Sequence, residues 1–143
     1  SKILKNNKRV KVDFQCKDIS KINLKKSNLI ISVLLFPFLN LDQRKALLKK
    51  IYKSLNSGGA FICVEKIRAK NSYFEDILNQ MYFDFKLSKN LSEEEILNKA
   101  KSLRSSMYLF DEKKSKSLLE SAGFKNYEIF FKCFNFIGYI AIR

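Results

Sequence analysis

Two kinds of hydrophobic pattern alternate along the chain, one typical of strands and the other of helices. Runs that are apolar at every position, or at every second position, predict strands, whereas apolar residues three or four positions apart predict amphipathic helices. The expected strands are Arg9–Gln15, Asn28–Leu35, Ala60–Ile67, Tyr127–Cys133 and Phe134–Ile142. The expected helices are Leu41–Leu55, Ser72–Lys86, Ser92–Met107 and Asp111–Ala122. This order predicts an α/β fold.

The last two expected strands follow each other closely, which predicts a hairpin and hence one antiparallel strand near the carboxyl terminus of a mostly parallel sheet. The run Asn28–Leu35 is apolar on both faces, as a central parallel strand is. No glycine-rich phosphate loop precedes these strands. Because ligand clefts of open α/β sheets form at the carboxyl ends of strands around a switch point, we expect the chain to supply one wall of such a cleft.

Polar residues and glycines mark the expected helix ends. Asp42 is expected to cap or to lead the first helix, and Ser92 with Glu95 three residues later forms a capping box. The sequence Asn56-Ser57-Gly58-Gly59 and the single Gly123 are expected to end the helices that precede them, since glycine readily adopts the left-handed conformation. We find no internal repeat or linker, so residues 1–143 are interpreted as one domain.

The charge balance is strongly basic, with 28 Lys and Arg against 14 Asp and Glu, a formal net charge of +14. Such an excess can indicate a nucleic-acid partner. The lysines are scattered, however, and Lys, Asn, Ile, Phe and Tyr are common while Gly, Pro and Trp are scarce, which favours drift in an A/T-rich genome. The longest apolar run, Leu29–Leu39, is too short to span a bilayer, and the start of the chain lacks an apolar signal segment. We therefore expect no membrane partner and a cytoplasmic location.

Residues that bind metals or form covalent intermediates are few. Histidine is absent, which excludes Ser-His-Asp and Cys-His nucleophile systems. Cys16, Cys63 and Cys133 are far apart, so no zinc site is expected. Cys63 and Cys133 lie in apolar strand patterns and are expected to be buried, reduced thiols.

Several short motifs follow one another along the chain. They are Asp18-Ile19, the run from Leu47 to Ala60, Glu65-Lys66, Met81 with Asp84-Phe85-Lys86, Ser92-Glu93 with Glu95-Ile96, Ala122-Gly123-Phe124 and Cys133-Phe134-Asn135-Phe136. In this order they resemble the carboxy-S-adenosylmethionine synthase family of class I S-adenosyl-L-methionine (SAM)-dependent methyltransferases. The resemblance spans essentially all 143 residues and implies the carboxyl-terminal half of a Rossmann-like sheet, without the amino-terminal glycine loop.

The resemblance implies a reaction as well as a fold. Members of the family convert SAM and prephenate to carboxy-SAM and phenylpyruvate, and a partner enzyme then uses carboxy-SAM to modify the wobble uridine of tRNA. The implied cofactor is SAM, the implied small-molecule partner is prephenate, and the chain itself is expected to form a homodimer without binding nucleic acid. A start at Ser1 and the missing glycine loop suggest a piece of a longer protein.

The resemblance also implies candidate binding residues. At the position of Asp18 the family uses a carboxylate to accept a hydrogen bond from adenine, and the backbone N–H of Ile19 would donate one to the ring. Val33 stands where the family has an asparagine facing the cofactor, and it can contribute only a wall. Ala100 stands where the family has the arginine that binds the extra carboxylate. Arg104, expected one turn further on the same helix face, is a candidate to replace that arginine. No catalytic residue is assigned.

Alternatives remain at each level. Asp18 can be a plain loop aspartate beside Lys17 and Lys21, and Arg104 a solvated cation. The aromatic stretch Tyr73–Phe85 is interpreted as a packing or dimer surface rather than a base-stacking one. The whole chain can instead be a SAM-dependent methyltransferase of other specificity, or a non-catalytic basic module that binds RNA or a protein.

Overall fold

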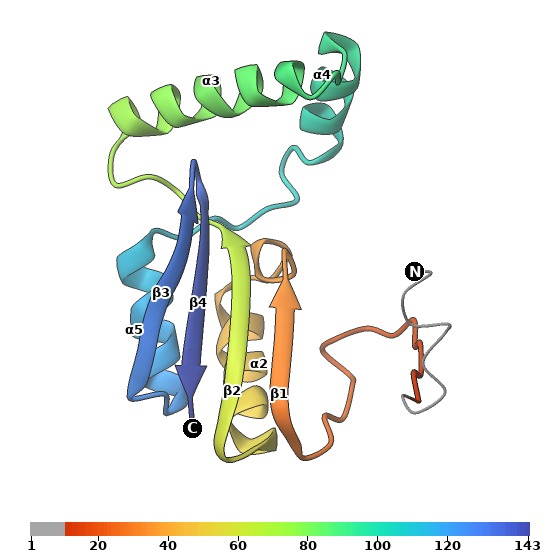
Figure 1. The fold of residues 1–143 in the computed structure, drawn as a ribbon, viewed down its shortest axis with the longest axis vertical. Helices are drawn as coiled ribbons and strands as arrows, with labels where there is room; N and C mark the ends of the chain where they lie inside the picture. Colours follow the sequence, from red (N-terminus) through yellow and green to blue (C-terminus); the bar gives the residue numbers. More distant parts are fainter. Residues whose placement is uncertain (1–10) are drawn as a thin grey trace.

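Four strands form one sheet in the order β1-β2-β4-β3 in the computed structural model, which describes residues 11–143 (Figure 1). The strands are β1 (Ser27–Val33), β2 (Leu55–Lys66), β3 (Asn126–Cys133) and β4 (Phe136–Ile142). β1 and β2 are parallel, and β4 is antiparallel to both β2 and β3. The prediction of a mostly parallel sheet with one antiparallel strand near the carboxyl terminus is confirmed.

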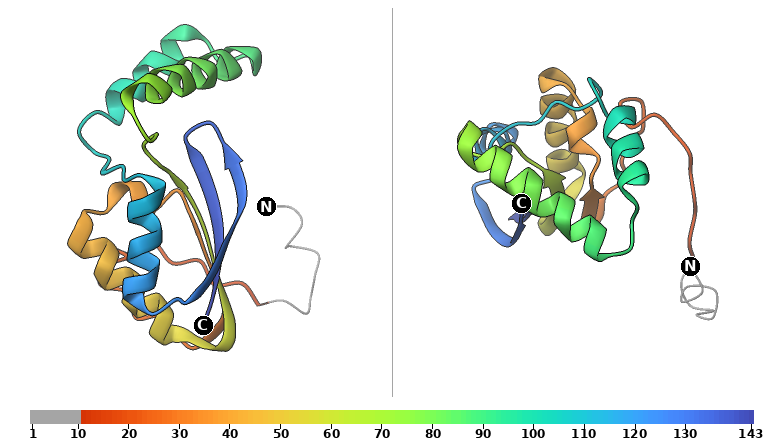
Figure 2. Two further views of the ribbon diagram at one scale, coloured as in Figure 1. Left: turned by 90° about the vertical axis from the view of Figure 1, so that its left-hand side faces the viewer. Right: turned by 90° about the horizontal axis from the view of Figure 1, so that it is seen from above.

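Helices cover one face of this sheet and one of its ends. The helices α2 (Leu41–Ser54) and α5 (Glu112–Ala122) pack side by side on the same face (Figure 2). The helices α3 (Ser72–Ser88) and α4 (Glu93–Ser102) lie beyond the carboxyl ends of β1 and β2 (Figure 1). Within residues 11–143, every helix is too short or too polar to span a bilayer.

The core lies between the sheet and the helices α2 and α5. It contains side chains of α2, β2, α5 and the loop after α5, among them Leu47, Ile51, Phe61, Leu119 and Phe124. The rings of Phe61 and Phe124 stack with centroids 5.9 Å apart. Burial of these apolar side chains is the main source of the fold's stability.

Local polar contacts set most helix ends. The Ser92 hydroxyl accepts from Glu95 N–H and the Glu95 carboxylate accepts from Ser92 N–H, so the predicted capping box is confirmed. Gly123 has a φ of 113° and ends α5 as predicted. The cap of α2 is Asn40 rather than Asp42, because its side chain and that of Gln43 exchange hydrogen bonds with each other's backbone N–H.

The first expected strand, Arg9–Gln15, is wrong in its described part. Residues 11–15 are not a strand, and Val12 and Phe14 are 41% and 85% exposed. Arg9 and Val10 lie outside the described residues. An alternating pattern forms a strand only where a neighbouring strand pairs with its backbone, and no strand pairs with this segment within residues 11–143.

Three other expected boundaries are also corrected. β2 begins at Leu55 rather than Ala60, directly after α2, so Gly58 takes its left-handed φ of 74° inside the strand and not at a helix end. A register shift between β1 and β2 after Ser27 accommodates these residues. α4 ends at Ser102 instead of Met107, and β4 begins at Phe136 instead of Phe134.

The cysteines differ in their surroundings. Cys63 is buried as expected, and burial together with the nearby Glu65 carboxylate raises the pKa of its thiol. Cys133 is exposed, so its expected burial is wrong. The reason is its place as the last residue of β3, a strand at the edge of the sheet.

Within residues 11–143, no helix packs on the face of the sheet opposite α2 and α5 (Figure 2), and apolar side chains of β1 are exposed there. In β1, Leu29, Ile31 and Val33 are 50%, 59% and 61% exposed and share this face because side chains alternate along a strand. Their partners across β2 are Ala60, Ile62 and Val64. We call the three β1 side chains with these three partners the open face.

Candidate functional site

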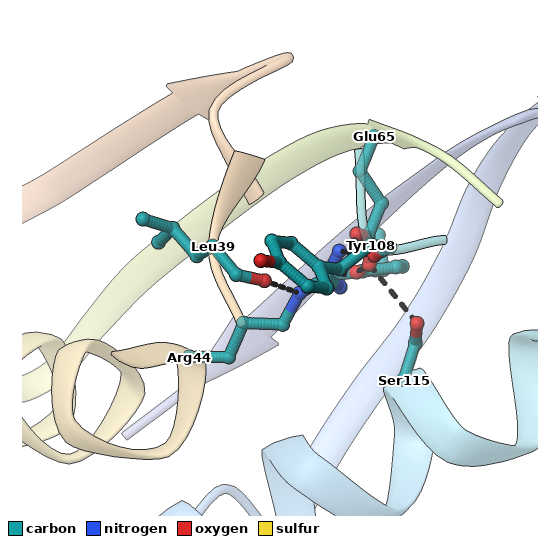
Figure 3. A network of polar contacts seen from close by, with 6 residues as sticks. Leu39, Arg44, Glu65, Tyr108 and Ser115 are labelled. Atoms are coloured by element: carbon teal, nitrogen blue, oxygen red, sulfur yellow. Dashed lines mark hydrogen bonds and ion pairs between the residues drawn. The ribbon is translucent and has the colours of Figure 1, made fainter. Parts of the chain in front are cut away.

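A buried ion pair joins the elements at the carboxyl end of β2. Arg44 of α2 and Glu65 of β2 are each 1% exposed, and Arg44 Nη1 lies 2.8 Å from Glu65 Oε2 (Figure 3). The other carboxylate oxygen, Glu65 Oε1, accepts hydrogen bonds from the hydroxyls of Ser115 in α5 and Tyr139 in β4. We call these four side chains the polar network.

Arg44 also holds two backbone segments in place (Figure 3). Its Nε donates to Leu39 O at 3.1 Å, and its Nη2 donates to Tyr108 O at 2.6 Å. The guanidinium lies 4.5 Å from the centroid of the Phe110 ring. Through these contacts one side chain fixes the turn after β1 and the segment that returns from α4. Both are thereby held at the carboxyl ends of β1 and β2, which we call the carboxyl edge of the sheet.

The polar network leaves almost no room for solvent. The void beside it measures about 10 Å³, near the minimum of roughly 10–15 Å³ that one water needs. Burial raises the pKa of Tyr139 well above its ordinary value, so the phenol stays protonated and donates to Glu65. The charges of Arg44 and Glu65 therefore compensate each other, and the hydroxyls of Ser115 and Tyr139 supply further hydrogen bonds.

The polar network is absent from the sequence-based predictions, although the sequence holds signals for it. Arg44 lies on the same helix face as Leu47, Leu48 and Ile51, at spacings of three, four and seven residues. Glu65 directly follows the apolar run Phe61–Val64. A cation on an apolar helix face and an anion at the end of a buried strand indicate a buried pair, since neither is stable there alone.

Asp18 lies in an exposed turn. Its Oδ1 accepts from Ser20 N at 2.9 Å and from the Ser20 hydroxyl at 2.8 Å, and these bonds lower the pKa of its carboxyl. Within the described residues its other oxygen has no hydrogen-bond partner, so it is able to accept a bond from an amine. Ile19 is half-buried against the core.

The turn that holds Asp18 is tied to the last turns of α2. Lys50 Nζ donates to Ser20 O at 3.1 Å and to Ile22 O at 2.9 Å, and the Ser54 hydroxyl donates to Leu24 O at 3.3 Å. α2 runs back from the carboxyl edge toward the start of β1 (Figure 1). Asp18 and Ile19 are thus held near the amino end of β1, and the structure does not bring them together with Val33.

Val33 ends β1 at the carboxyl edge of the sheet. It pairs with Val64 of β2 and is 61% exposed on the open face. The next residue, Leu34, has a φ of 55° and donates its N–H to Val64 O at 2.7 Å. A bulky residue in the left-handed region turns the chain sharply here, so the backbone leaves the sheet and Val33 remains accessible as a wall.

The two positions considered for the extra carboxylate lie on or after α4. Ala100 is exposed on the helix. Arg104 was expected one turn further along the same helix, but α4 ends at Ser102 and Arg104 lies in the following turn, where its N–H donates to Lys101 O. The expected shared helix face of Ala100 and Arg104 is therefore wrong.

Comparisons with known proteins agree on the class of fold. The model of the ubiE/COQ5 methyltransferase family matches residues 1–141. A Staphylococcus epidermidis protein named carboxy-S-adenosyl-L-methionine synthase is 38% identical over 126 residues, which are 88% of this chain and 55% of that protein. The Actinobacillus succinogenes protein of the same name is 33% identical over 134 residues, 94% of this chain and 56% of that protein. The resemblance inferred from the motifs is confirmed, and the chain spans about half the length of these relatives.

Solved structures with low sequence identity share the fold. Human N-acetylserotonin methyltransferase in complex with SAM has a TM-score of 0.61 at 18% identity, over 92% of this chain and 33% of that one. The pyocyanin biosynthetic protein PhzM has a TM-score of 0.58 at 12% identity, over 89% of this chain and 33% of that one. In both cases the chain corresponds to one part of a larger protein.

Proposed function

Because this chain belongs to the ubiE/COQ5 methyltransferase family, we propose that it contributes one wall of the active site of a SAM-dependent transferase. The observation that supports this most strongly is the match of the family model to residues 1–141. The parallel pair β1 and β2, which ends in a shared carboxyl edge, is the place where open α/β sheets bind their ligands.

The finer proposal concerns the reaction that the resemblance of the motifs implies. We propose that the complete active site converts SAM and prephenate to carboxy-SAM, phenylpyruvate and water, and that carboxy-SAM then serves the modification of the tRNA wobble uridine. The motif order and 33–38% identity to carboxy-S-adenosyl-L-methionine synthases support it. We further propose a homodimer in the cytoplasm.

The proposed roles of the chain's own residues follow from their chemistry. Asp18 accepts a hydrogen bond from the adenine amine through the oxygen that does not bind Ser20, and Ile19 N–H donates to the ring. Because contacts with α2 hold the turn at 18–21 near the amino end of β1, these two roles require that turn to leave α2 and move to the carboxyl edge, where Val33 forms an apolar wall. SAM supplies a sulfonium that acidifies its methyl group. The polar network keeps the edge rigid, so that the wall does not have to be ordered at binding.

The experiment joins the chain to the part of the Staphylococcus epidermidis relative that it does not match, in the order of the relative. We refer to this added part as the complementary part. The fusion is incubated with SAM and prephenate, and the products are identified by mass spectrometry. We expect an adenosyl product heavier than SAM by one carbon dioxide, and no such product without prephenate. Retention of SAM with no carboxylated product would overturn the finer proposal and favour a methyltransferase of other specificity.

Replacing Ala100 by arginine is expected to tighten carboxy-SAM binding by roughly tenfold in the fusion, because guanidinium pairs with a carboxylate in a bidentate fashion. The affinity for SAM, which lacks that carboxylate, is expected to stay unchanged. The matched control is Asn98→Arg, which adds the same charge at another exposed position of α4. Equal gains for both ligands, or for both variants, would contradict a specific carboxylate contact.

A further inference from the structure

The outer face of α2 carries a row of lysines. Lys45, Lys49 and Lys53 are all exposed, on the side of the helix that faces away from the buried Leu47 and Ile51. Because they follow one another at four-residue spacing, they share one face, and each lies about 6 Å further along the helix axis than the one before. We propose that this row binds the phosphate backbone of RNA. We call these three side chains the lysine row.

The lysine row is not compensated by carboxylates of the protein. Within residues 11–143, the basic side chains that form ion pairs are Arg44, Lys116 and Lys132, none of which belongs to the row. The one acidic residue of α2, Asp42, lies in the first helical turn, where the helix dipole favours a negative charge. The row therefore presents its full positive charge to an external anion.

Two further cations meet the row at the end of α2. Lys26 Nζ donates to Lys53 O at 2.8 Å, and Arg143 Nη1 donates to the same oxygen at 3.3 Å. The Arg143 guanidinium also lies 5.2 Å from the centroid of the Tyr52 ring. Like charges held this close repel one another, so an anion that binds beside them is stabilising.

Positive charge is concentrated in this part of the molecule. Residues 16–56, which contain β1 and α2, hold eight lysines against two acidic residues. Residues 72–102, which contain α3 and α4, hold four lysines against six acidic residues. A compositional drift toward lysine would act on both regions alike. We expected no nucleic-acid partner because the lysines are scattered along the sequence, and the lysine row supplies the clustered charge that this expectation lacked.

The surroundings of the row favour a polymer of phosphates over a membrane. Helices that lie on a bilayer insert large apolar side chains beside their cations, but no large apolar side chain is exposed among the described residues of α2. A spacing of about 6 Å along the helix axis is closer to that of successive phosphates in A-form RNA than in B-form DNA. One RNA strand is therefore able to set successive phosphates against successive lysines.

The row stays accessible when the chain binds other partners through the sheet. It lies on the helix side of the sheet, whereas the open face lies on the other side (Figure 2). A polypeptide that covers the open face leaves the outer surface of α2 in solvent. The inference can therefore be tested on the fusion as well as on the chain alone.

Binding is measured by fluorescence anisotropy with a labelled RNA hairpin, at salt concentrations between about 50 and 200 mM. The 143-residue chain and its fusion with the complementary part are both used, without SAM or prephenate. We expect a dissociation constant of roughly 1–100 µM at physiological salt, which rises as salt is added because binding releases counterions from the RNA.

Variants locate the site. Replacing the lysine row by glutamine is expected to weaken RNA binding by roughly tenfold and to reduce the slope of log affinity against log salt by about 2–3, since each phosphate contact contributes nearly one released counterion. The matched control removes the same charge from α3 and α4 by replacing the exposed Lys89, Lys99 and Lys101. It is expected to change the affinity by less than about twofold and to keep the salt slope.

The inference is overturned if neither protein binds the RNA hairpin, if the control weakens binding as much as the row variant does, or if the row variant keeps the salt slope. A DNA hairpin of the same sequence is expected to bind more weakly, and equal binding would overturn the assignment to RNA. Vesicles of phosphatidylserine and phosphatidylcholine are expected not to compete, and competition that depends on the row would favour a membrane instead. None of these outcomes involves the transferase reaction, so each proposal can fail alone.

Discussion

Replacing Arg44 by methionine is expected to lower the free energy of unfolding by about 3–5 kcal/mol, because it leaves the Glu65 carboxylate buried without its cation. The Ser115 and Tyr139 hydroxyls still donate to that carboxylate, but neither carries a positive charge. The loss is a large share of the stability of a small domain, which is roughly 5–15 kcal/mol. A variant this weakened populates unfolded chains measurably.

The measurement is unfolding in denaturant, with the rate of alkylation of Cys63 as the probe of the unfolded fraction. This thiol is buried beside the polar network and its pKa is raised, so in the folded protein it reacts far more slowly than the exposed Cys16 and Cys133. The matched control is Lys45→Met, an exposed cation on the same helix, which is expected to change stability by less than about 0.5 kcal/mol.

A double variant separates the pair from its surroundings. Arg44→Met combined with Glu65→Leu removes both charges, and it is expected to be more stable than Arg44→Met alone, because an apolar replacement of both partners avoids the unpaired buried charge. If Arg44→Met costs no more than Lys45→Met, the guanidinium is not the group that compensates Glu65, and the described role of the polar network is wrong.

The sequence was sufficient for features that depend on neighbouring residues. The both-face apolar run at Asn28–Leu35 predicted a strand, and the Ser92–Glu95 box and Gly123 predicted helix ends, because each of these patterns acts over a few residues. The antiparallel pairing of β3 with β4 was predictable because two strands joined by a short turn pair as a hairpin.

Features that depend on distant residues were not predictable in the same way. Arg44 and Glu65 are 21 residues apart, and Arg44 and Tyr108 are 64 apart, so only the folded chain reveals their contact. The pattern around Val12 and Phe14 suits a strand, yet the described structure offers it no neighbour. For the same reason Asp18 and Val33 are candidate site residues that the described contacts hold apart.

The complementary part is expected to bind this chain through the open face. When the two parts are co-expressed as separate polypeptides, we expect them to co-purify. Replacing Leu29, Ile31 and Val33 together by threonine is expected to reduce the recovered complex at least about tenfold, because each exposed apolar side chain gains roughly 1 kcal/mol or more when it is buried. Threonine retains the tendency to form strands, so β1 is expected to persist.

The physical reason lies in the surroundings of β1. Within residues 11–143 this strand pairs only with β2, so its other edge presents unpaired backbone groups beside an uncovered apolar surface. Strands with apolar side chains on both faces belong inside sheets covered on both sides, and the curated relatives contain nearly as much chain again as this one matches. A further strand would pair with the backbone at the free edge of β1, and helices attached to that strand would bury the open face.

The control and the contrary result use other exposed apolar side chains. Met81, Leu91 and Leu97 lie on or between α3 and α4, are 50%, 41% and 50% exposed, and are replaced by threonine in the matched control. The control is expected to co-purify with the complementary part as the unaltered chain does. Two results would contradict the prediction: the control variant loses the complex as fully as the β1 variant does, or the β1 variant retains the complex. Either result would mean that the exposed apolar side chains of β1 do not bind the complementary part, and that the SAM site is completed at another edge of the sheet.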